Sequence, residues 1–211
     1  TASIDMLLAI EELNNKLYIK TNKQLFLTGY SQGGHACMAT HKTLEQEYAD
    51  QFTITASSPM SGAYDMSGVQ ATVMLKAYPE PVYLPYLLIG INEVYNVTDK
   101  DKLFRAPYDS LVPILYKGHL NLQEINAYLP EIPADLVHPD LLKEYQNNPD
   151  IKFNAALKEN DLVDWKPTAP TQLCYCNADK IVLHENAFVA FKQMKENGSK
   201  TVTLRKAAKN L

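Results

Sequence analysis

The sequence predicts an α/β fold in which a parallel sheet of about four strands is flanked by helices and interrupted by a helical insertion. Two observations lead to this fold. Short apolar runs alternate with helical patterns towards both ends of the chain, and such alternation is typical of a parallel sheet. The middle of the chain shows only helical patterns, broken repeatedly by proline, which predicts a separate helical part.

The elements before the insertion follow in regular order. Apolar residues near helical spacing predict a helix over residues 3–18. The run KQLFLT at 23–28 predicts a buried strand, because central strands of a parallel sheet are apolar on both faces. The remaining expected elements are a sharp turn at 29–34, a helix at 32–48, a strand at 52–56 and a polar loop at 57–63.

The insertion begins after residue 65, where prolines and tyrosines become frequent and no strand pattern is found. We expect a helical cap over 79–165, with the core formed by 1–78 and 166–211. Beyond the cap the alternation resumes. It predicts a strand at 171–176, a helix at 184–195 and a last strand at 200–205.

Composition excludes several classes of protein. The chain has 211 residues, 46% of them hydrophobic, and a net charge of -4, which gives no reason to expect a nucleic acid or an acidic membrane as partner. No run approaches the roughly 18 apolar residues of a membrane span. The three cysteines are too few for a disulfide framework and have no zinc-site spacing, so structural thiols and no metal or cofactor are expected.

The turn Gly29-Tyr30-Ser31-Gln32-Gly33 lies between a predicted strand and a predicted helix. In that context a G-x-S-x-G motif places the serine on a strained turn, with its Oγ at the end of the sheet. The glycines avoid clashes where strand and helix approach closely. Ser31 is therefore the candidate nucleophile, and the backbone N–H of Gln32 is a candidate oxyanion donor. The alternative is a glycine-rich turn with an incidental serine.

The segment LTGYSQGGHA at 27–36 resembles the nucleophile elbow of the α/β-hydrolase superfamily. It is similar, more narrowly, to bacterial esterases and lipases related to secretory lipases, which combine a G-Y-S-Q-G-G elbow with a helical cap. The resemblance implies a triad in the order serine, acid, histidine. Asp179, directly after the strand that follows the cap, is the candidate acid. Asp161 and Asp164 are weaker candidates, and Asp179 could instead be a turn or N-cap residue.

The resemblance also implies a catalytic histidine after the last strand, but no histidine follows His184. His35 and His41 lie on the helix after Ser31, and His119 and His138 lie in the cap. All five are expected to have packing, surface or pocket-lining roles, with His184, His119 and His138 as the weaker alternatives for the base. We therefore expect a fragment that lacks the catalytic histidine, the N-terminal strands and the second oxyanion donor of the fold. The missing strands or a second chain should cover the exposed sheet edge.

The functional expectation is a serine hydrolase that cleaves small-molecule esters through an acyl-enzyme on Ser31. Peptidase or thioesterase chemistry on the same site, and a non-catalytic binding module, are the alternatives. The fragment alone should have little activity, because it lacks the base. Resemblance to secreted lipases favours a secreted or periplasmic protein.

Overall fold

The computed structural model describes residues 2–207, which form two compact units. The first unit comprises Thr1–Asp65 together with Leu162–Leu211, and the second comprises Met66–Asp161. From the sequence, the cap was expected over 79–165. In the structure, the segment after Met66 packs in the helical unit through Ala71 and Met74, whereas Trp165 packs in the sheet unit.

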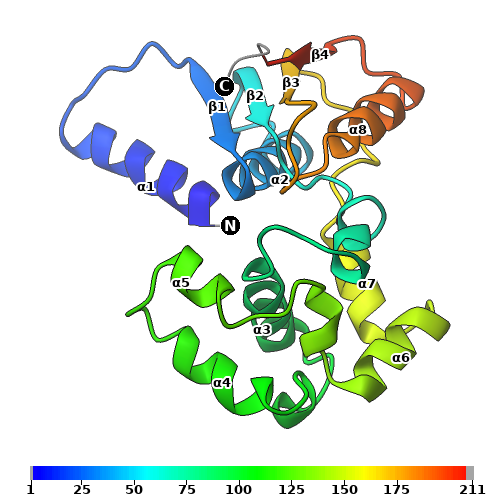
Figure 1. Cartoon of the computed structure of the whole chain (residues 1–211). Helices are drawn as coiled ribbons and strands as arrows, with labels where there is room; N and C mark the ends of the chain where they lie inside the picture. The colour runs from blue at the N-terminus through cyan, green and yellow to red at the C-terminus, as the bar shows by residue number, and fades with distance from the viewer. Residues whose placement is uncertain (1, 208–211) are drawn as a thin grey trace. The chain divides into compact units, whose positions relative to one another are not determined.

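The sheet unit contains four parallel strands in the order β1-β2-β3-β4 (Figure 1). This agrees with the sheet predicted from the sequence. The strands are β1 (Leu25–Tyr30), β2 (Ile54–Met60), β3 (Thr171–Tyr175) and β4 (Val202–Lys206). Each strand therefore lies beside the strand that follows it in the chain, and β1 forms one edge of the described sheet.

Within residues 2–207, three helices belong to this unit. They are α1 (Ala2–Lys16), α2 (Gln32–Glu47) and α8 (Glu185–Glu196). Helix α2 packs on β1 and β2, and α8 packs on β3 and β4. Leu27 on β1 is partly buried against Ile4 of α1 and Leu44 of α2, so these helices cover the sheet face that carries Leu27.

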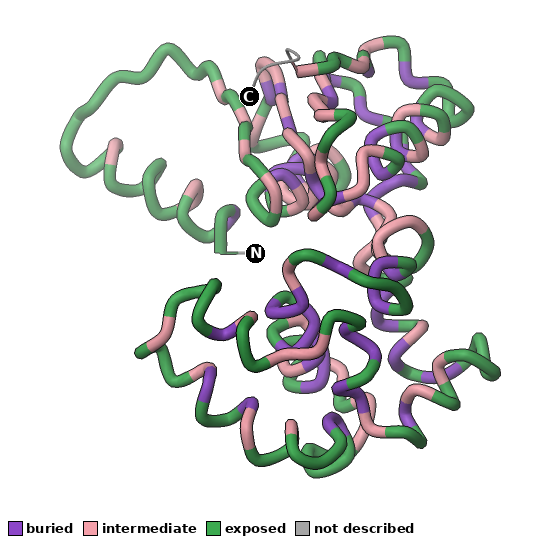
Figure 2. Tube along the Cα trace, viewed as in Figure 1, coloured by how far each residue is buried: buried purple, intermediate pink, exposed green. Residues whose placement is uncertain are grey.

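On β1, side chains on the opposite face are exposed (Figure 2). Phe26 is 61% exposed and Tyr30 is 66% exposed. The strand predicted from its apolar run is therefore exposed on one face within the described residues. Since β1 is an edge strand in this sheet, its outward-facing aromatic side chains have neither a neighbouring strand nor a covering helix among residues 2–207.

Strand β2 is longer than its sequence predicts, because four residues expected in a loop belong to it. The segment Ser57 to Met60 pairs in register with β1. Its small polar side chains find partners within the sheet unit: Ser57 Oγ lies 3.7 Å from Cys37 Sγ, and Ser58 Oγ lies 3.7 Å from Cys174 Sγ. Strand β1 also continues to Tyr30, which leaves Ser31 alone as the turn.

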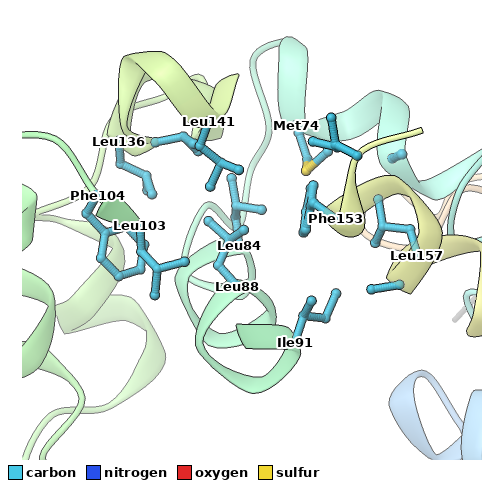
Figure 3. Packing of buried hydrophobic residues seen from close by; sticks show 14 of the residues in the cluster. Met74, Leu84, Leu88, Ile91, Leu103, Phe104, Leu136, Leu141, Phe153 and Leu157 are labelled. Atoms are coloured by element: carbon cyan, nitrogen blue, oxygen red, sulfur yellow. The ribbon is translucent and has the colours of Figure 1, made fainter. Parts of the chain in front are cut away.

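The helical unit is built from short helices around its own apolar core (Figure 3). Leu84, Leu88, Leu136, Phe153 and Leu157 belong to this core. The elements are η1 (Gln70–Leu75), α3 (Tyr83–Tyr95), η2 (Lys100–Lys102), α4 (Tyr108–Leu115), α5 (Leu122–Asn126), η3 (Pro133–Leu136), α6 (Pro139–Asn147) and α7 (Lys152–Glu159). Within residues 2–207, no helix is both long and apolar enough to cross a membrane.

Candidate functional site

Ser31 connects β1 directly to α2 and has φ 57° and ψ -122°. A residue other than glycine rarely adopts a positive φ, and the strain must be offset by its surroundings. Ser31 N donates to Met60 O at 3.0 Å, while Ser31 O accepts from Gly34 N at 2.9 Å and His35 N at 3.2 Å. The neighbouring strand and the first turn of α2 thus hold the strained conformation that the motif predicts.

The glycines around Ser31 differ in how closely they are packed. A Cβ added to Gly29 would lie 2.0 Å from Gly33 O, and one added to Gly34 would lie 2.4 Å from Met60 O. A Cβ on Gly33 would meet no described atom within 4 Å. The expectation that a side chain at residue 33 would clash is therefore wrong, because the backbone of Gly33, and not its side-chain position, faces Gly29.

A further close approach was not predicted from the sequence. A Cβ on Gly62 would lie 2.7 Å from His35 N and 2.4 Å from a ring carbon of Tyr64. The loop after β2 therefore passes directly over the first turn of α2. The signal in the sequence is a single glycine in a stretch of small residues, which by itself does not reveal which segment it contacts.

The N-terminus of α2 presents its amides next to Ser31. Gln32 is the first residue of the helix, and the first amides of a helix have no partner within it. The Ser31 side chain makes no N-cap hydrogen bond in the described chain, although serine often serves that role. The hydroxyl is therefore not used to cap the helix, and the positive end of the helix dipole lies beside it.

Asp179 lies in the loop after β3 and is half-buried. Its Oδ1 accepts hydrogen bonds from Ile181 N and Val182 N, both at 3.0 Å, and its own N–H donates to Cys176 O at 3.1 Å. These bonds use one carboxylate oxygen and fix the orientation of the side chain. They also correspond to the turn role that the sequence left open as the alternative.

The sheet register relates Ser31 to the Asp179 loop. Tyr30 pairs with Met60, and Met60 pairs with Cys174. Ser31 and the loop that follows β3 therefore leave the sheet at the same carboxyl edge, with only β2 between them. Two strand spacings amount to about 10 Å. A histidine ring that bridges a hydroxyl and a carboxylate by two hydrogen bonds spans a comparable distance of about 8 Å.

The two weaker acid candidates have other partners. Asp161 accepts from the backbone and the hydroxyl of Ser67, so it holds the two ends of the helical unit together. Asp164 accepts from Asn197 Nδ2 at 2.8 Å. Both contacts join segments that are distant in the sequence, and neither involves the loop that follows β3.

The histidines differ in their surroundings. His41 is fully buried, with Nε2 at 3.0 Å from Glu45 Oε1, and is therefore a packing residue. His138 Nδ1 accepts from Asp140 N at the start of α6. His184 precedes α8 and packs against the rings of Tyr175 and Phe188, at centroid distances of 6.3 and 5.6 Å. The two others are half-buried His35 on α2 and exposed His119 in the helical unit.

Glu45 is a half-buried acidic residue whose role the sequence did not reveal. Its carboxylate accepts from Thr168 N at 2.8 Å and Ala169 N at 2.7 Å, and it contacts His41. Burial raises the pKa of Glu45, but the hydrogen bonds from His41, Ala169 and Thr168 outweigh this effect and lower the pKa to about 2. Glu45 thus ties α2 to the segment that enters β3.

Solved structures of other proteins contain a similar arrangement. No family model and no curated protein matches the sequence. The rice cell wall degrading esterase LipA from Xanthomonas oryzae is a structural neighbour, with 27% identity and a TM-score of 0.84 over 99% of this chain and 57% of that chain. A Legionella pneumophila protein assigned as a hydrolase has 28% identity and a TM-score of 0.88, over 99% of this chain and 56% of that chain.

Candida antarctica lipase A matches at 17% identity and a TM-score of 0.72, over 93% of this chain and 46% of that chain, a likeness that concerns the fold alone. The chain thus spans little more than half the length of the first two neighbours. Its four parallel strands and flanking helices agree with these structures. The chain therefore has an α/β-hydrolase-type fold and forms part of such a domain.

Proposed function

We propose that the protein is a serine hydrolase that cleaves carboxylic esters, with Ser31 as the nucleophile. The observation that carries this proposal is the strained backbone of Ser31 between β1 and α2. A strained residue that is not glycine persists only where its surroundings hold it, and such residues cluster at functional sites. The likeness to the Xanthomonas oryzae esterase supports ester hydrolysis in particular.

In the proposed reaction, Ser31 Oγ attacks the ester carbonyl carbon while a general base removes its proton. The negative charge that develops on the carbonyl oxygen is stabilised by the backbone N–H of Gln32, at the start of α2. Collapse of the tetrahedral intermediate breaks the bond to the alcohol, which leaves with the proton from the base. Water then attacks the acyl-enzyme, and the acid is released.

Asp179 is proposed to orient the base and to stabilise its protonated form. Its position at the carboxyl edge of the sheet and the two hydrogen bonds that hold its Oδ1 support this role. The base itself is proposed to be a histidine outside residues 1–211, in a loop that follows β4. His41 is unsuited to the role, because its ring is fully buried against Glu45 and Trp165.

A partner segment is proposed to pair with the free edge of β1. Exposed Phe26 and Tyr30 support this proposal, since soluble proteins avoid exposed apolar sheet edges. Helix α1 also carries exposed apolar side chains, with Met6, Ile10 and Leu13 at spacings of four and three residues. The segment comes from other strands of the same polypeptide or from a second chain, and supplies the second oxyanion donor.

The helical unit, residues 66–161, is proposed to serve as a cap that shapes the substrate site.

A second proposal concerns activity: residues 1–211 alone should hydrolyse esters poorly, because the base and one oxyanion donor lie outside them. Loss of a single oxyanion donor typically lowers turnover by about 10²–10³-fold.

The test uses the product of the complete coding sequence that contains this chain, assayed on p-nitrophenyl acetate. Ser31→Ala should lower kcat at least about 10³-fold, because no other group can form the acyl-enzyme. Ser3→Ala, at an exposed position on α1, is the matched control and should leave kcat unchanged. Ester hydrolysis that persists in Ser31→Ala would contradict the proposal. A protein without hydrolysis of esters, thioesters or peptides would instead favour a non-catalytic binding module.

A further inference from the structure

The helical unit contains a cavity of about 70 Å³ that is partly open to solvent. Its walls come from η1, α3, η3 and α7 and from the segments on either side of η1, so the cavity lies within Met66–Asp161. Figure 3 shows Met74, Leu84 and Leu157, which line it, on three different elements. The packing of this unit therefore leaves an unfilled space next to its own core.

The lining of the cavity is suited to an apolar group. Met74, Leu84 and Leu87 present hydrocarbon and thioether surface, and no charged side chain belongs to the described residues of its wall. Burying an ion without a partner costs several kcal/mol, so charged ligands are excluded. The polar side chains of the wall are those of Gln70 and two tyrosines. Since an ordered water needs two to four polar partners, this mainly apolar wall is better suited to an apolar group than to water.

The volume limits the size of the occupant. An apolar cavity of about 150 Å³ accommodates benzene. A cavity of about half that volume holds an alkyl group of about three or four carbons, and the open side leaves room for the rest of the molecule. We propose that this cavity is a binding site for the short alkyl group of an uncharged molecule. This site is separate from the proposed catalysis, because binding requires neither Ser31 nor a general base.

The six methionines of the chain provide the readout. Met66 and Met74 line the cavity, whereas buried Met38 and Met194 belong to the sheet unit. With methyl-labelled methionine, titration of the full chain with 1-butanol should give saturable shifts of the Met66 and Met74 signals. The Met38 and Met194 signals should not move, and exposed Met6 reports any general effect of the alcohol.

The length of the alkyl chain tests the proposed ligand class. Each added methylene from ethanol to butanol should tighten binding about fourfold, which corresponds to about 0.8 kcal/mol per buried methylene. Butyrate should not bind at the same concentration, because its charge cannot enter the cavity. Equal affinity for ethanol and butanol, or parallel shifts of all six signals without saturation, would overturn the proposal.

Two cavity variants and one control test the location. Ala71→Leu adds three carbons to the cavity wall and should weaken butanol binding at least tenfold. Ala127→Leu, the same change at an exposed position of this unit, should bind like the wild type. Leu87→Phe fills the cavity from a partly buried position and serves as the second test where Ala71→Leu is too crowded to fold. Wild-type affinity in a folded cavity variant would place the ligand elsewhere.

Discussion

Ser31 has a backbone conformation that only glycine adopts without strain, yet its position has a serine. The strain is offset by backbone hydrogen bonds: Ser31 N donates to Met60 O, and Ser31 O accepts from Gly34 N and His35 N. The turn can also pack closely because Gly29 and Gly34 have no side chains. A side chain at either position would collide with a neighbouring carbonyl oxygen. At the residue scale, contacts with neighbouring residues thus hold the turn in its strained conformation. That conformation leaves the Ser31 hydroxyl at the end of the strand.

The strain itself is measurable. Ser31→Gly and Ser31→Ala both remove the hydroxyl, but only glycine relieves the positive φ. We expect the Ser31→Gly variant to be more stable than the Ser31→Ala variant, with a free energy of unfolding that is higher by about 1 kcal/mol. The reason is that a strained residue costs about 1–3 kcal/mol. Urea denaturation of both variants measures the difference. An alanine variant as stable as the glycine variant would show that Ser31 is not strained.

The motif glycines should respond unequally to the same change. Gly29→Ala places a Cβ against the Gly33 carbonyl and is expected to destabilise the protein by about 1–3 kcal/mol. Gly33→Ala meets open space in the first turn of α2, where alanine favours a helix by up to about 1 kcal/mol. Thermal or urea unfolding distinguishes the two. Equal losses for both variants would mean that the turn is packed differently.

At the scale of whole elements, Glu45 connects helix α2 to the segment that enters β3. Helix α2 and the segment entering β3 are more than one hundred residues apart in sequence, yet Thr168 and Ala169 donate their amides to the Glu45 carboxylate. Because hydrogen bonds lower the pKa of Glu45 to about 2, the charged form is stabilised in the folded state. The stabilisation is present above the normal pKa of 4.5 and is lost as the pH falls towards 2.

Glu45→Gln should therefore lower the free energy of unfolding by about 2–3 kcal/mol at pH 7. The difference from wild type should shrink as the pH falls from about 4.5 to about 2, because wild-type Glu45 then becomes neutral as well. Glu47→Gln on the exposed side of the same helix is the control, with an expected change below about 0.5 kcal/mol. A pH-independent loss in Glu45→Gln would show that packing, and not charge, accounts for it.

The regular elements could be predicted from the sequence because local patterns determine them. The strand before Ser31, the helix after it and the resumption of strands at Thr171 all follow from apolar spacing. The end of β2 was missed, because serine and proline residues resemble a loop unless their strand neighbours are known. Glu45 and Gly62 were missed for the same reason: their roles depend on segments that are distant in sequence.

At the scale of the whole molecule, the chain consists of a sheet unit and a helical unit that each have a core. The helical unit begins and ends at one place, since Ser67 N donates to Asp161 Oδ1 at 2.9 Å. In the sequence, the change of character that marks this insertion begins after residue 65, whereas the cap was expected over 79–165. Prolines identify the interior of the insertion in the sequence. For the apolar residues near each end, the sequence does not indicate whether they pack in the core of the helical unit or in that of the sheet unit.

Residues 66–161 should accordingly fold when they are expressed alone. We expect helical circular dichroism and a cooperative thermal transition, because the core around Leu88 and Leu136 lies entirely within this segment. Leu88→Ala should abolish or strongly lower this transition, with a loss of about 2–5 kcal/mol. Exposed Leu122→Ala is the matched control and should have little effect. An unfolded segment would show that its core depends on the sheet unit.

The central claim is that Ser31 is an activated nucleophile, and covalent labelling tests it most directly. The product of the complete coding sequence is treated with a fluorophosphonate, and its peptides are mapped by mass spectrometry. We predict a single adduct on Ser31, formed at an unchanged rate in Ser3→Ala and much more slowly in Asp179→Asn, with Asp50→Asn as the matched control. An adduct on another serine, with Ser31 unmodified, would contradict the account.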